Sequence, residues 1–416
     1  MLSFDSIRQL LIMLLLTAGV LSHYPAQAAE TLRIAVIDTL SGPFAKEGDA
    51  MVSHLRFVAS RINAQGGVLG KKLEIAPFDN KGSPQETLII LRDVIDQGIR
   101  YVAQGNGSHV AGALIEAIDK HNERNPDAAV LFLNYSALNP ELTNELCSFW
   151  HFRFDANTEM RLAALTDYIA DQTQIRKVFL INQDYAHGQQ VSSLARQMLA
   201  TKAPEITVVG DMLHPIGKVR DFSPYIARIR SSGADAVITG NWGNDLSLLV
   251  RAGAEAGIDV EYFTFYAGGF GVPMAMGAAG NDKVFQVTEW HPDVPDEENT
   301  PEVARFAADF AAYTRQRTPW YFHRTHTLLA MLVAAMEKAQ STQPLAVARA
   351  LEGLQYSTAY GLARMRAEDH QLLQPLFLSR FSEAARHETE NSGYGWVTVE
   401  RIPAEQTALP SSCVMP

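Results

Sequence analysis

Short β-rich runs alternate with amphipathic helical segments along most of this chain, and this alternation constrains the fold more than any other feature. The apolar run 32–37 predicts a buried strand. The segment after it carries one apolar helix face with i, i+3, i+4 and i+7 spacing, formed by Leu55, Val58, Ala59 and Ile62. Strands that alternate with helices predict parallel sheets covered by helices on both faces.

The alternation occurs in two series, which predicts two α/β lobes. Strands are predicted at 73–78, 101–103 and 129–133 in the first series, and at 177–181, 206–209, 234–239 and 262–265 in the second. Ser83 to Glu86 forms a capping box that opens a helix, with Pro84 at the first helical position. We expect the region after Thr300 to be mostly helical and the tail after Pro403 to be irregular.

The N-terminus has the pattern of a secretory signal peptide. Arg8 precedes the apolar run 10–20, and Ala26-Gln27-Ala28 follows with small residues at the cleavage positions. The run is shorter than the roughly 20 apolar residues of a membrane span, which disfavours the alternative of an anchor helix. We therefore expect a signal peptide at 1–28, a mature chain that begins near Ala29, and a periplasmic location.

Composition narrows the classes of partner. The formal net charge of the 416 residues is -11, and basic residues are not clustered. An acidic chain without a basic patch is not expected to bind nucleic acid. Charged residues make up 19% and hydrophobic residues 47% of the chain, which is ordinary for a globular protein.

The chain has two cysteines, Cys147 and Cys413. An exported protein is exposed to an oxidising compartment, where thiols tend to pair. We predict a disulfide that ties the C-terminal tail to the middle of the chain, with two free thiols as the alternative.

A glycine-rich turn is the first candidate ligand site. Residues 104–109, Gln-Gly-Asn-Gly-Ser-His, join a predicted strand to a predicted helix. Open α/β sheets bind ligands beyond the C-terminal ends of their strands, and helix N-termini attract anions. Ser108 is therefore a candidate for binding a carboxylate, although its hydroxyl could equally cap its own helix. Residues 134–137 end the next strand and would lie beside this turn.

Several longer stretches resemble one family. They are Leu40-Ser41-Gly42-Pro43-Phe44, residues 62–73, residues 139–143 and Asp184-Tyr185-Ala186-His187-Gly188. Together these stretches resemble the periplasmic leucine/isoleucine/valine-binding protein family. The resemblance implies a type I periplasmic binding fold, in which two Rossmann-like lobes with parallel sheets are joined by a hinge of three crossovers. It places lobe 1 at 30–154 and 291–357, and lobe 2 at 155–290 and 358–416 with the irregular tail.

The same resemblance implies a set of ligand-binding residues in the cleft between the lobes. Ser108 matches the serine that holds the ligand carboxylate, and Ser136 matches a position whose backbone meets the ligand. Thr158 matches a cleft position on the second lobe. The remaining matches are aromatic or acidic positions of the family, occupied here by Tyr185, His187, Trp242 and Tyr266.

Three departures from the family pattern point to a change of ligand. Tyr266 stands where the family has the carboxylate that pairs with the ligand's ammonium, and Leu138 replaces a threonine. Glu47 occupies a usually aromatic position and could supply a relocated counter-charge. An unpaired buried ammonium costs several kcal/mol. We therefore expect an aromatic or aliphatic carboxylic acid rather than an ordinary branched-chain amino acid.

The resemblance implies a substrate-binding component of an ABC importer, which captures a small carboxylate-bearing or amino-acid-like ligand in the interlobe cleft and acts with a membrane permease and without a cofactor. We expect a monomer. We also expect that it is not an enzyme, because G-x-S-x-G and H-E-x-x-H are absent from the sequence and Gly112 falls two residues late for G-x-G-x-x-G. His323 and His326 lie at i and i+3, but the sequence offers no clear third metal ligand. A sensor of the same fold that reports to a signalling partner is the alternative.

Overall fold

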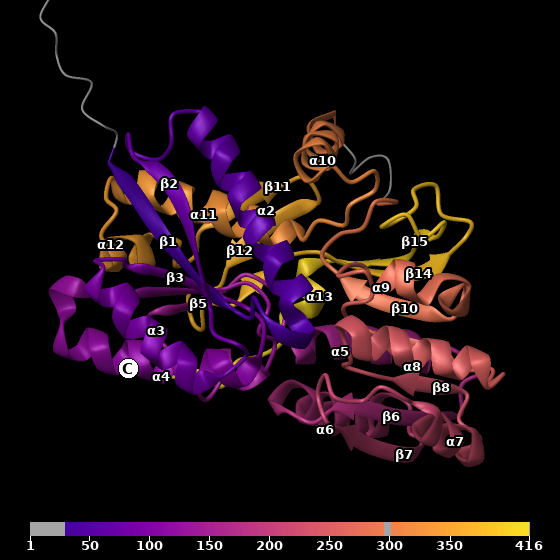
Figure 1. Cartoon of the computed structure of the whole chain (residues 1–416). Coiled ribbons are helices and arrows are strands. Elements are labelled where there is room, and N and C mark those ends of the chain that lie inside the picture. Colours follow the sequence, from indigo (N-terminus) through magenta and orange to yellow (C-terminus); the bar gives the residue numbers. More distant parts are fainter. Residues whose placement is uncertain (1–29, 295–300, 416) are drawn as a thin grey trace, which may run out of the picture.

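Two α/β lobes lie side by side in this computed structural model, which describes residues 30–294 and 301–415 (Figure 1). The predicted signal peptide at 1–28 lies outside the described residues.

The first lobe is built on a five-stranded sheet in which every neighbouring pair is parallel. Its strands, in spatial order, are β2 (Lys72–Asp79), β1 (Thr31–Asp38), β3 (Tyr101–Gln104), β4 (Leu131–Asn134) and β5 (His151–Arg153).

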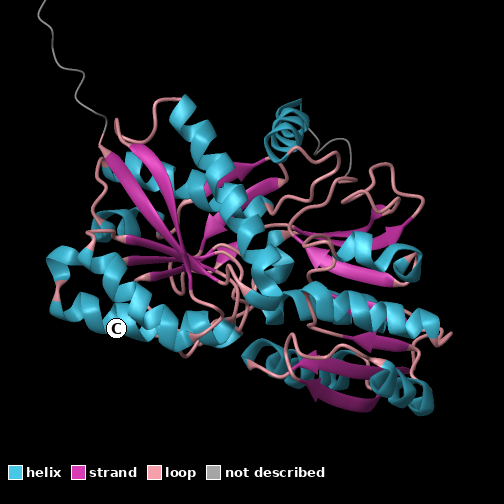
Figure 2. Ribbon diagram, viewed as in Figure 1, coloured by secondary structure: helices cyan, strands magenta, loops and turns pink. Residues whose placement is uncertain are grey.

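Helices cover both faces of this sheet (Figure 2). Inward residues alternate along each strand with a period of two. On β1, Ala35 and Ile37 join the core beneath α3 (Pro84–Asp96) and α4 (Ser108–Arg124), whereas Ile34 and Val36 join the core on the opposite face. Two helices that contact each other supply that opposite core, α2 (Ala45–Ala64) and α11 (His323–Ala339). The predicted capping box is confirmed, because the Ser83 side chain accepts a hydrogen bond from the Glu86 amide.

The second lobe is built on a seven-stranded sheet. Its strands, in spatial order, are β15 (Gly395–Ile402), β14 (Leu376–Ser382), β10 (Val284–Thr288), β9 (Glu261–Thr264), β8 (Ala236–Ile238), β6 (Lys177–Gln183) and β7 (Thr207–His214). The strands from β6 to β10 pair in parallel, and β14 and β15 add two antiparallel strands at one edge. The helices of this part of the chain are α5 (Thr158–Ala170), α6 (Ala186–Lys202), α7 (Ser223–Ser232), α8 (Gly243–Glu255) and α9 (Val272–Met276).

The parallel parts of the two sheets have the same strand order. The order β2-β1-β3-β4-β5 in one lobe is repeated as β7-β6-β8-β9-β10 in the other. In such sheets the strand order reverses beside the first strand, and ligands bind beyond the C-terminal ends of the strands at that point. The two switch points therefore lie between β1 and β3 and between β6 and β8.

The chain passes between the two sheets three times. It crosses after β5, returns between β10 and α10 (Pro301–Thr314), and crosses again between β13 and β14. The remaining elements are α12 (Pro344–Leu351), a small sheet of β11 (Gln355–Thr358), β12 (Gly361–Met365) and β13 (Leu372–Leu373), α13 (Ala404–Thr407), and the 3-10 helices η1 (Gly42–Phe44), η2 (Pro126–Ala128), η3 (Pro140–Thr143) and η4 (Gly277–Gly280). The residue boundaries predicted for the lobes stay a prediction.

The predicted fold class is confirmed, and two expectations about its elements are corrected. All eight strands predicted in the two series are present with shifted ends, the largest extension being β7 to His214. The region after Thr300 is helical as far as Leu351, but five strands lie within 355–402, and the tail that we expected to be irregular contains α13. Of these strands, β14 pairs antiparallel with β10, about 90 residues earlier, so local periodicity did not reveal its place in the sheet.

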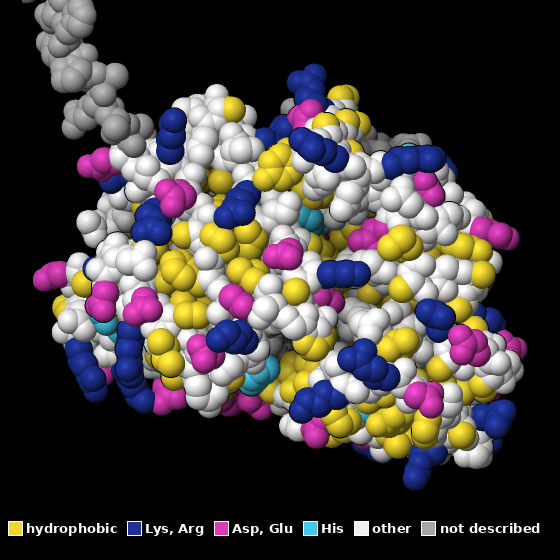
Figure 3. All heavy atoms as spheres, in the orientation of Figure 1, with side chains coloured by type: hydrophobic (Ala, Val, Ile, Leu, Met, Phe, Trp, Pro, Cys, Tyr) yellow, Lys and Arg dark blue, Asp and Glu magenta, His cyan; other side chains and the backbone are white. Residues whose placement is uncertain are grey.

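The surface agrees with an acidic chain that lacks a basic patch. On the face drawn in Figure 3, Lys and Arg side chains are interspersed with Asp and Glu side chains. Across residues 30–294 and 301–415, we find no helix with the length and apolarity needed to cross a membrane.

Candidate functional site

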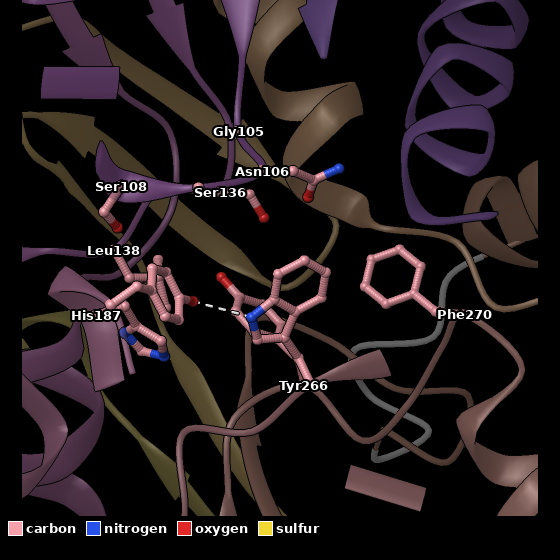
Figure 4. A pocket seen from close by; sticks show the side chains of 11 residues that line it. Gly105, Asn106, Ser108, Ser136, Leu138, His187, Tyr266 and Phe270 are labelled. Atoms are coloured by element: carbon pink, nitrogen blue, oxygen red, sulfur yellow. Dashed lines mark hydrogen bonds between the residues drawn. The ribbon is translucent and has the colours of Figure 1, made fainter. Parts of the chain in front are cut away.

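A small pocket lies where the two switch points face each other, and we call it the inner pocket. Its lining comes from the ends of strands and the turns that follow them: Gly105, Asn106, Gly107, Ser108, Ser136, Leu138, Tyr185, His187, Trp242, Tyr266 and Phe270. Six of the eight residues predicted from the sequence line it, and Figure 4 shows Ser108, Ser136, His187 and Tyr266 around the same space. Its volume is ≈ 20 Å³, which is room for roughly one water.

The glycine-rich turn between β3 and α4 forms one wall of the inner pocket. A Cβ at Gly105 would collide with the Tyr135 ring, and Gly107 has a φ of 99°, so both positions require glycine. This turn brings the first residues of α4 to the pocket. The first N–H groups of a helix have no partner within it and attract anions.

Ser108 does not cap its own helix, so that alternative is wrong. The N-cap of α4 is Gly107, and Ser108 is the first helical residue. The Ser108 Oγ instead accepts a hydrogen bond from the Asn139 amide at 3.2 Å, with the side chain only 4% exposed. This contact fixes the hydroxyl oxygen at the pocket and leaves its proton free to be donated to a bound carboxylate.

Aromatic side chains from the second lobe form the opposite wall. The Trp242 Nε1 donates a hydrogen bond to the Tyr185 hydroxyl at 2.9 Å, the bond drawn dashed in Figure 4. Trp242 also packs on Phe44 of the first lobe, with ring centroids 4.3 Å apart. Trp242 and Tyr266 are each 8% exposed, so a flat ligand would meet two rings that are already held in place.

A buried ion network supports Tyr266 from behind. The Tyr266 hydroxyl donates to the Asp155 Oδ2 at 2.7 Å. Asp155 also pairs with Arg161 and Arg324, and the Arg324 Nη1 lies 3.0 Å from the Glu289 Oε1. Both guanidinium groups lie 5.1 Å from the centroid of the Tyr266 ring.

This network has two positive and two negative side chains, so its formal charge is balanced. Buried charges are stable only when they are paired in this way. The Arg324 Nη2 also donates to the Ser136 Oγ at 3.0 Å, which ties the network to the pocket wall. Neither Asp155 nor Glu289 lines the inner pocket, and the residues that do line it include no Asp or Glu.

His187 is neutral and is held by Thr158. Burial and the nearby charge of Arg161 lower the pKa of His187 to about 4. Its Nδ1 lies 2.8 Å from the Thr158 Oγ1, which is itself 3.1 Å from the Leu138 carbonyl oxygen of the other lobe. Thr158 therefore contacts the site through His187 and does not line the inner pocket.

Glu47 also does not line the inner pocket, although it lies next to it in the closed cleft. It is 3% exposed, and a Cβ at Gly243 would collide with its Oε1, so the carboxyl group packs on the backbone that follows Trp242. Its Oε2 has no hydrogen-bond partner within the described part of the chain. Burial raises the pKa of Glu47 from 4.5 to about 7, with a smaller contribution from Asp245 and Asp38.

The chain matches the family of periplasmic binding proteins over residues 31–386. It belongs to that family. A relative from Brucella abortus, Leu/Ile/Val-binding protein homolog 4, is 30% identical over 396 residues, which is 93% of each chain. The resemblance described from the sequence is thus confirmed, and so is the prediction of a substrate-binding protein.

Solved structures agree with this assignment. A leucine-, isoleucine-, valine-, threonine- and alanine-binding protein from Brucella ovis, in a closed conformation, has a TM-score of 0.83 at 30% identity, covering 93% of this chain and all (100%) of that one. A solute-binding protein of an ABC transporter from Rhodopseudomonas palustris, in complex with 3,4-dihydroxybenzoic acid, has a TM-score of 0.75 at 17% identity, covering 90% of this chain and 98% of that one. The second likeness shows a shared fold.

Sequence reasoning missed several residues of this binding protein's site. Asn106 and Phe270 line the inner pocket, and Arg324 supports it. Phe270 follows Gly268-Gly269, a glycine pair that marks a close approach of the backbone and could have drawn attention to this loop. Arg324 lies on a buried helix face and has no local signal, because its partners Ser136 and Glu289 are distant in sequence.

The two cysteines are bonded to each other, whereas the two histidines of α11 pack against aromatic rings. Cys147 and Cys413 form a disulfide across 266 residues, as predicted. The rings of His323 and His326 lie 5.2 Å apart and pack against aromatic neighbours. Over the described ranges of the chain, we find no group of three His, Cys, Asp or Glu residues placed to hold a metal ion.

Proposed function

We propose that this binding protein captures a small carboxylic acid in the interlobe cleft and delivers it, unchanged, to a membrane ABC permease. The observation that carries the proposal is the Ser108 turn, which faces a pocket lined by aromatic residues and by no acidic residue. The turn offers a hydroxyl and a helix N-terminus to an anion.

The aromatic wall argues for an apolar or flat ligand body. Trp242 and Tyr266 offer ring faces opposite the Ser108 turn, and His187 is neutral because burial lowers its pKa. A ligand ammonium would find the nearby carboxylates of Asp155 and Glu289 already paired with Arg161 and Arg324. Leaving an ammonium unpaired in a buried site costs several kcal/mol.

The compared proteins support a carboxylate as the common feature. The Brucella proteins are named for amino acids, and the Rhodopseudomonas protein holds an aromatic acid. Both kinds of ligand end in a carboxylate, the group for which the Ser108 turn is suited.

An amino acid is the second candidate, and one residue favours it. Glu47 has a carboxyl oxygen without a partner and contacts the backbone directly after Trp242. If the cleft opens slightly, this group is placed to receive an ammonium. The ligand panel below separates the two candidates.

The test is the affinity of the Ser108→Ala variant, measured by calorimetry against benzoate, 4-hydroxybenzoate, leucine and valine. We expect benzoate-type acids to bind the wild type, and the variant to bind them about 5- to 150-fold more weakly, because a charge-assisted hydrogen bond is lost. Ser231→Ala, at an exposed serine of α7, is the matched control and should bind as the wild type does. Unchanged affinity in Ser108→Ala would contradict the proposed anchor. Binding of leucine and valine alone would favour the Glu47 alternative.

Family membership supports a proposal for the cellular setting. We infer a monomer that acts in the periplasm after removal of residues 1–28 and that changes no covalent bond in its ligand. Its partner would be the permease, which recognises the closed form.

A further inference from the structure

A second and much larger cavity, which we call the outer cavity, lies on the other side of Phe270 from the Ser108 turn. Its volume is ≈ 700 Å³. Its lining comes from both lobes, with Lys46 and His54 of α2 on one side and Phe270, Met274 and Glu390 on the other. It is therefore a further part of the interlobe cleft.

Phe270 is the wall that the two cavities share. It lines both of them, and Figure 4 shows its ring across the inner pocket from Ser108. The ring stacks on Phe322 with centroids 4.6 Å apart. Its backbone has a φ of 64°, a left-handed conformation that is unfavourable for a bulky residue.

The loop that carries Phe270 lies flat on aromatic rings. A Cβ at Gly268 would come within 2.5 Å of the Trp320 ring, and one at Gly269 within 2.7 Å of Phe322. The glycines on both sides of Phe270 leave this loop few side-chain contacts of its own. Glycine has wide conformational freedom, so Gly269 and Gly271 allow the backbone on either side of Phe270 to rotate. Movement of Phe270 would join the inner pocket to the outer cavity.

The outer cavity is mainly aromatic inside and charged at its edge. Five aromatic residues line it: Phe270, Phe310, Tyr313, Trp320 and Phe322. His54 is neutral, since burial lowers its pKa to about 3, and its Nδ1 accepts a hydrogen bond from the Phe322 amide. Of the charged lining residues, Lys46 and Asp49 are exposed, whereas Glu390 is half-buried and its Oε2 accepts a hydrogen bond from the Gly271 amide at 2.8 Å. Burial raises the pKa of Glu390 to about 7.

The volumes of the inner pocket and the outer cavity limit where a ligand can lie. Pockets for small organic ligands usually measure about 300–1,000 Å³. The outer cavity falls in this range, whereas the ≈ 20 Å³ of the inner pocket cannot hold even a benzoate in the closed form. The inner pocket therefore suits one small polar end of a ligand.

We propose that the inner pocket and the outer cavity form one elongated site, and that its ligand is an aryl-extended carboxylic acid. The carboxylate meets the Ser108 turn, and the aromatic body passes Phe270 and lies among the rings of the outer cavity. This inference rests on the proposed carboxylate function and adds the length and aromatic character of the ligand.

The test compares benzoate with 4-phenylbutyrate by calorimetry. We expect 4-phenylbutyrate to bind the wild type at least tenfold more tightly, because its longer chain carries the whole ring into the outer cavity, whereas the ring of benzoate stays beside Phe270. The double variant Tyr313→Ala/Met274→Ala removes two lining side chains that are 45% and 60% exposed, so the fold should not depend on them. It should weaken 4-phenylbutyrate at least tenfold and benzoate less than twofold. Leu362→Ala, at a residue 50% exposed on β12, is the matched control and should change neither affinity.

The possible failures are distinguishable. Weaker binding of 4-phenylbutyrate than of benzoate, or an equal effect of the double variant on both acids, would overturn the elongated site. If Ser108→Ala still weakens benzoate in that case, the carboxylate function stands. If neither acid binds the wild type, both the proposed function and this inference are overturned.

Discussion

Single residues in this protein take their roles from partners far away in the sequence. The Tyr266 hydroxyl reaches Asp155, 111 residues earlier. Arg324 reaches Ser136 across 188 residues. These contacts join Tyr266 and Ser136 to one internally balanced ion network.

Glu47 gives a prediction at the same scale, because its folded-state pKa of about 7 lies above the ordinary 4.5. The folded chain holds this proton more tightly than the unfolded chain. The stability contributed by protonation is thus fully present below about pH 4.5 and is lost as the pH rises toward 7. Glu47→Gln keeps the neutral shape at every pH. We expect it to raise the free energy of unfolding at pH 8 by about 1–3 kcal/mol and to leave it unchanged at pH 4.5.

Urea unfolding at several pH values measures this effect. Lys46, Asp245 and Asp38 are the charged groups that influence Glu47, and all three stay in the variant. Glu368→Gln, at an exposed glutamate, is the control and should not alter the pH profile. A Glu47→Gln profile parallel to that of the wild type would show that Glu47 is ionised in the folded chain.

At the scale of elements, the C-terminal tail acts as a fourth link between the lobes. It leaves β15 of the seven-stranded sheet, forms α13 beside α5, and ends at the disulfide to Cys147, just before β5 of the other sheet. Near the disulfide, the Ser411 Oγ donates to the Thr143 carbonyl oxygen at 3.1 Å. The tail thus runs along the hinge side and reinforces the three crossovers.

Removing this disulfide should destabilise the protein without unfolding it. Cys147→Ser/Cys413→Ser opens a loop closed across 266 residues. Disulfides typically contribute about 2–4 kcal/mol, chiefly by restricting the unfolded chain. We expect a loss in that range in urea unfolding under oxidising conditions, and the wild type with reductant should behave like the variant. If the variant were as stable as the oxidised wild type, the disulfide would add nothing to the stability that the other contacts of the tail provide.

At the scale of the whole molecule, the structure is a closed one with a pocket too small for its ligand. The lobes meet through Phe44 on Trp242, through Glu47 on Gly243, and through a hydrogen bond of 2.8 Å from the Gln190 Nε2 to the Glu141 Oε1. A ligand can enter only if these contacts open, since the inner pocket measures ≈ 20 Å³. A ligand then favours the closed form only by its differential affinity for it.

We therefore expect the radius of gyration measured by small-angle X-ray scattering to fall when an acid that the protein binds is added. At 100 times its dissociation constant the ligand should also raise the free energy of unfolding by about 2.7 kcal/mol. Ser108→Ala should show the same compaction at correspondingly higher ligand concentration. A radius that does not change with a saturating ligand would indicate that entry occurs without movement of the lobes.

The sequence by itself determined the local features of this protein. Four features could be predicted from the sequence because each depends on neighbours within a few residues or on a contiguous motif. They are the alternation of strands and helices, the capping box at Ser83, the glycine turn before Ser108 and the family resemblance. The cysteine pair was predicted from number and compartment alone. Six of the eight proposed ligand residues meet at the inner pocket because they end parallel strands, and such ends gather at one edge of a sheet.

Only the tertiary structure decided the rest. The antiparallel strands β14 and β15, the ion network around Tyr266 and the outer cavity beyond Phe270 depend on segments that are far apart in the chain. The tertiary structure also shows that Thr158 and Glu47 do not line the inner pocket, and that the Ser108 hydroxyl accepts a hydrogen bond from the Asn139 amide. The physical reason is common to all of these: a buried polar group or a cavity is defined by what packs against it, and packing brings together residues that no local period relates.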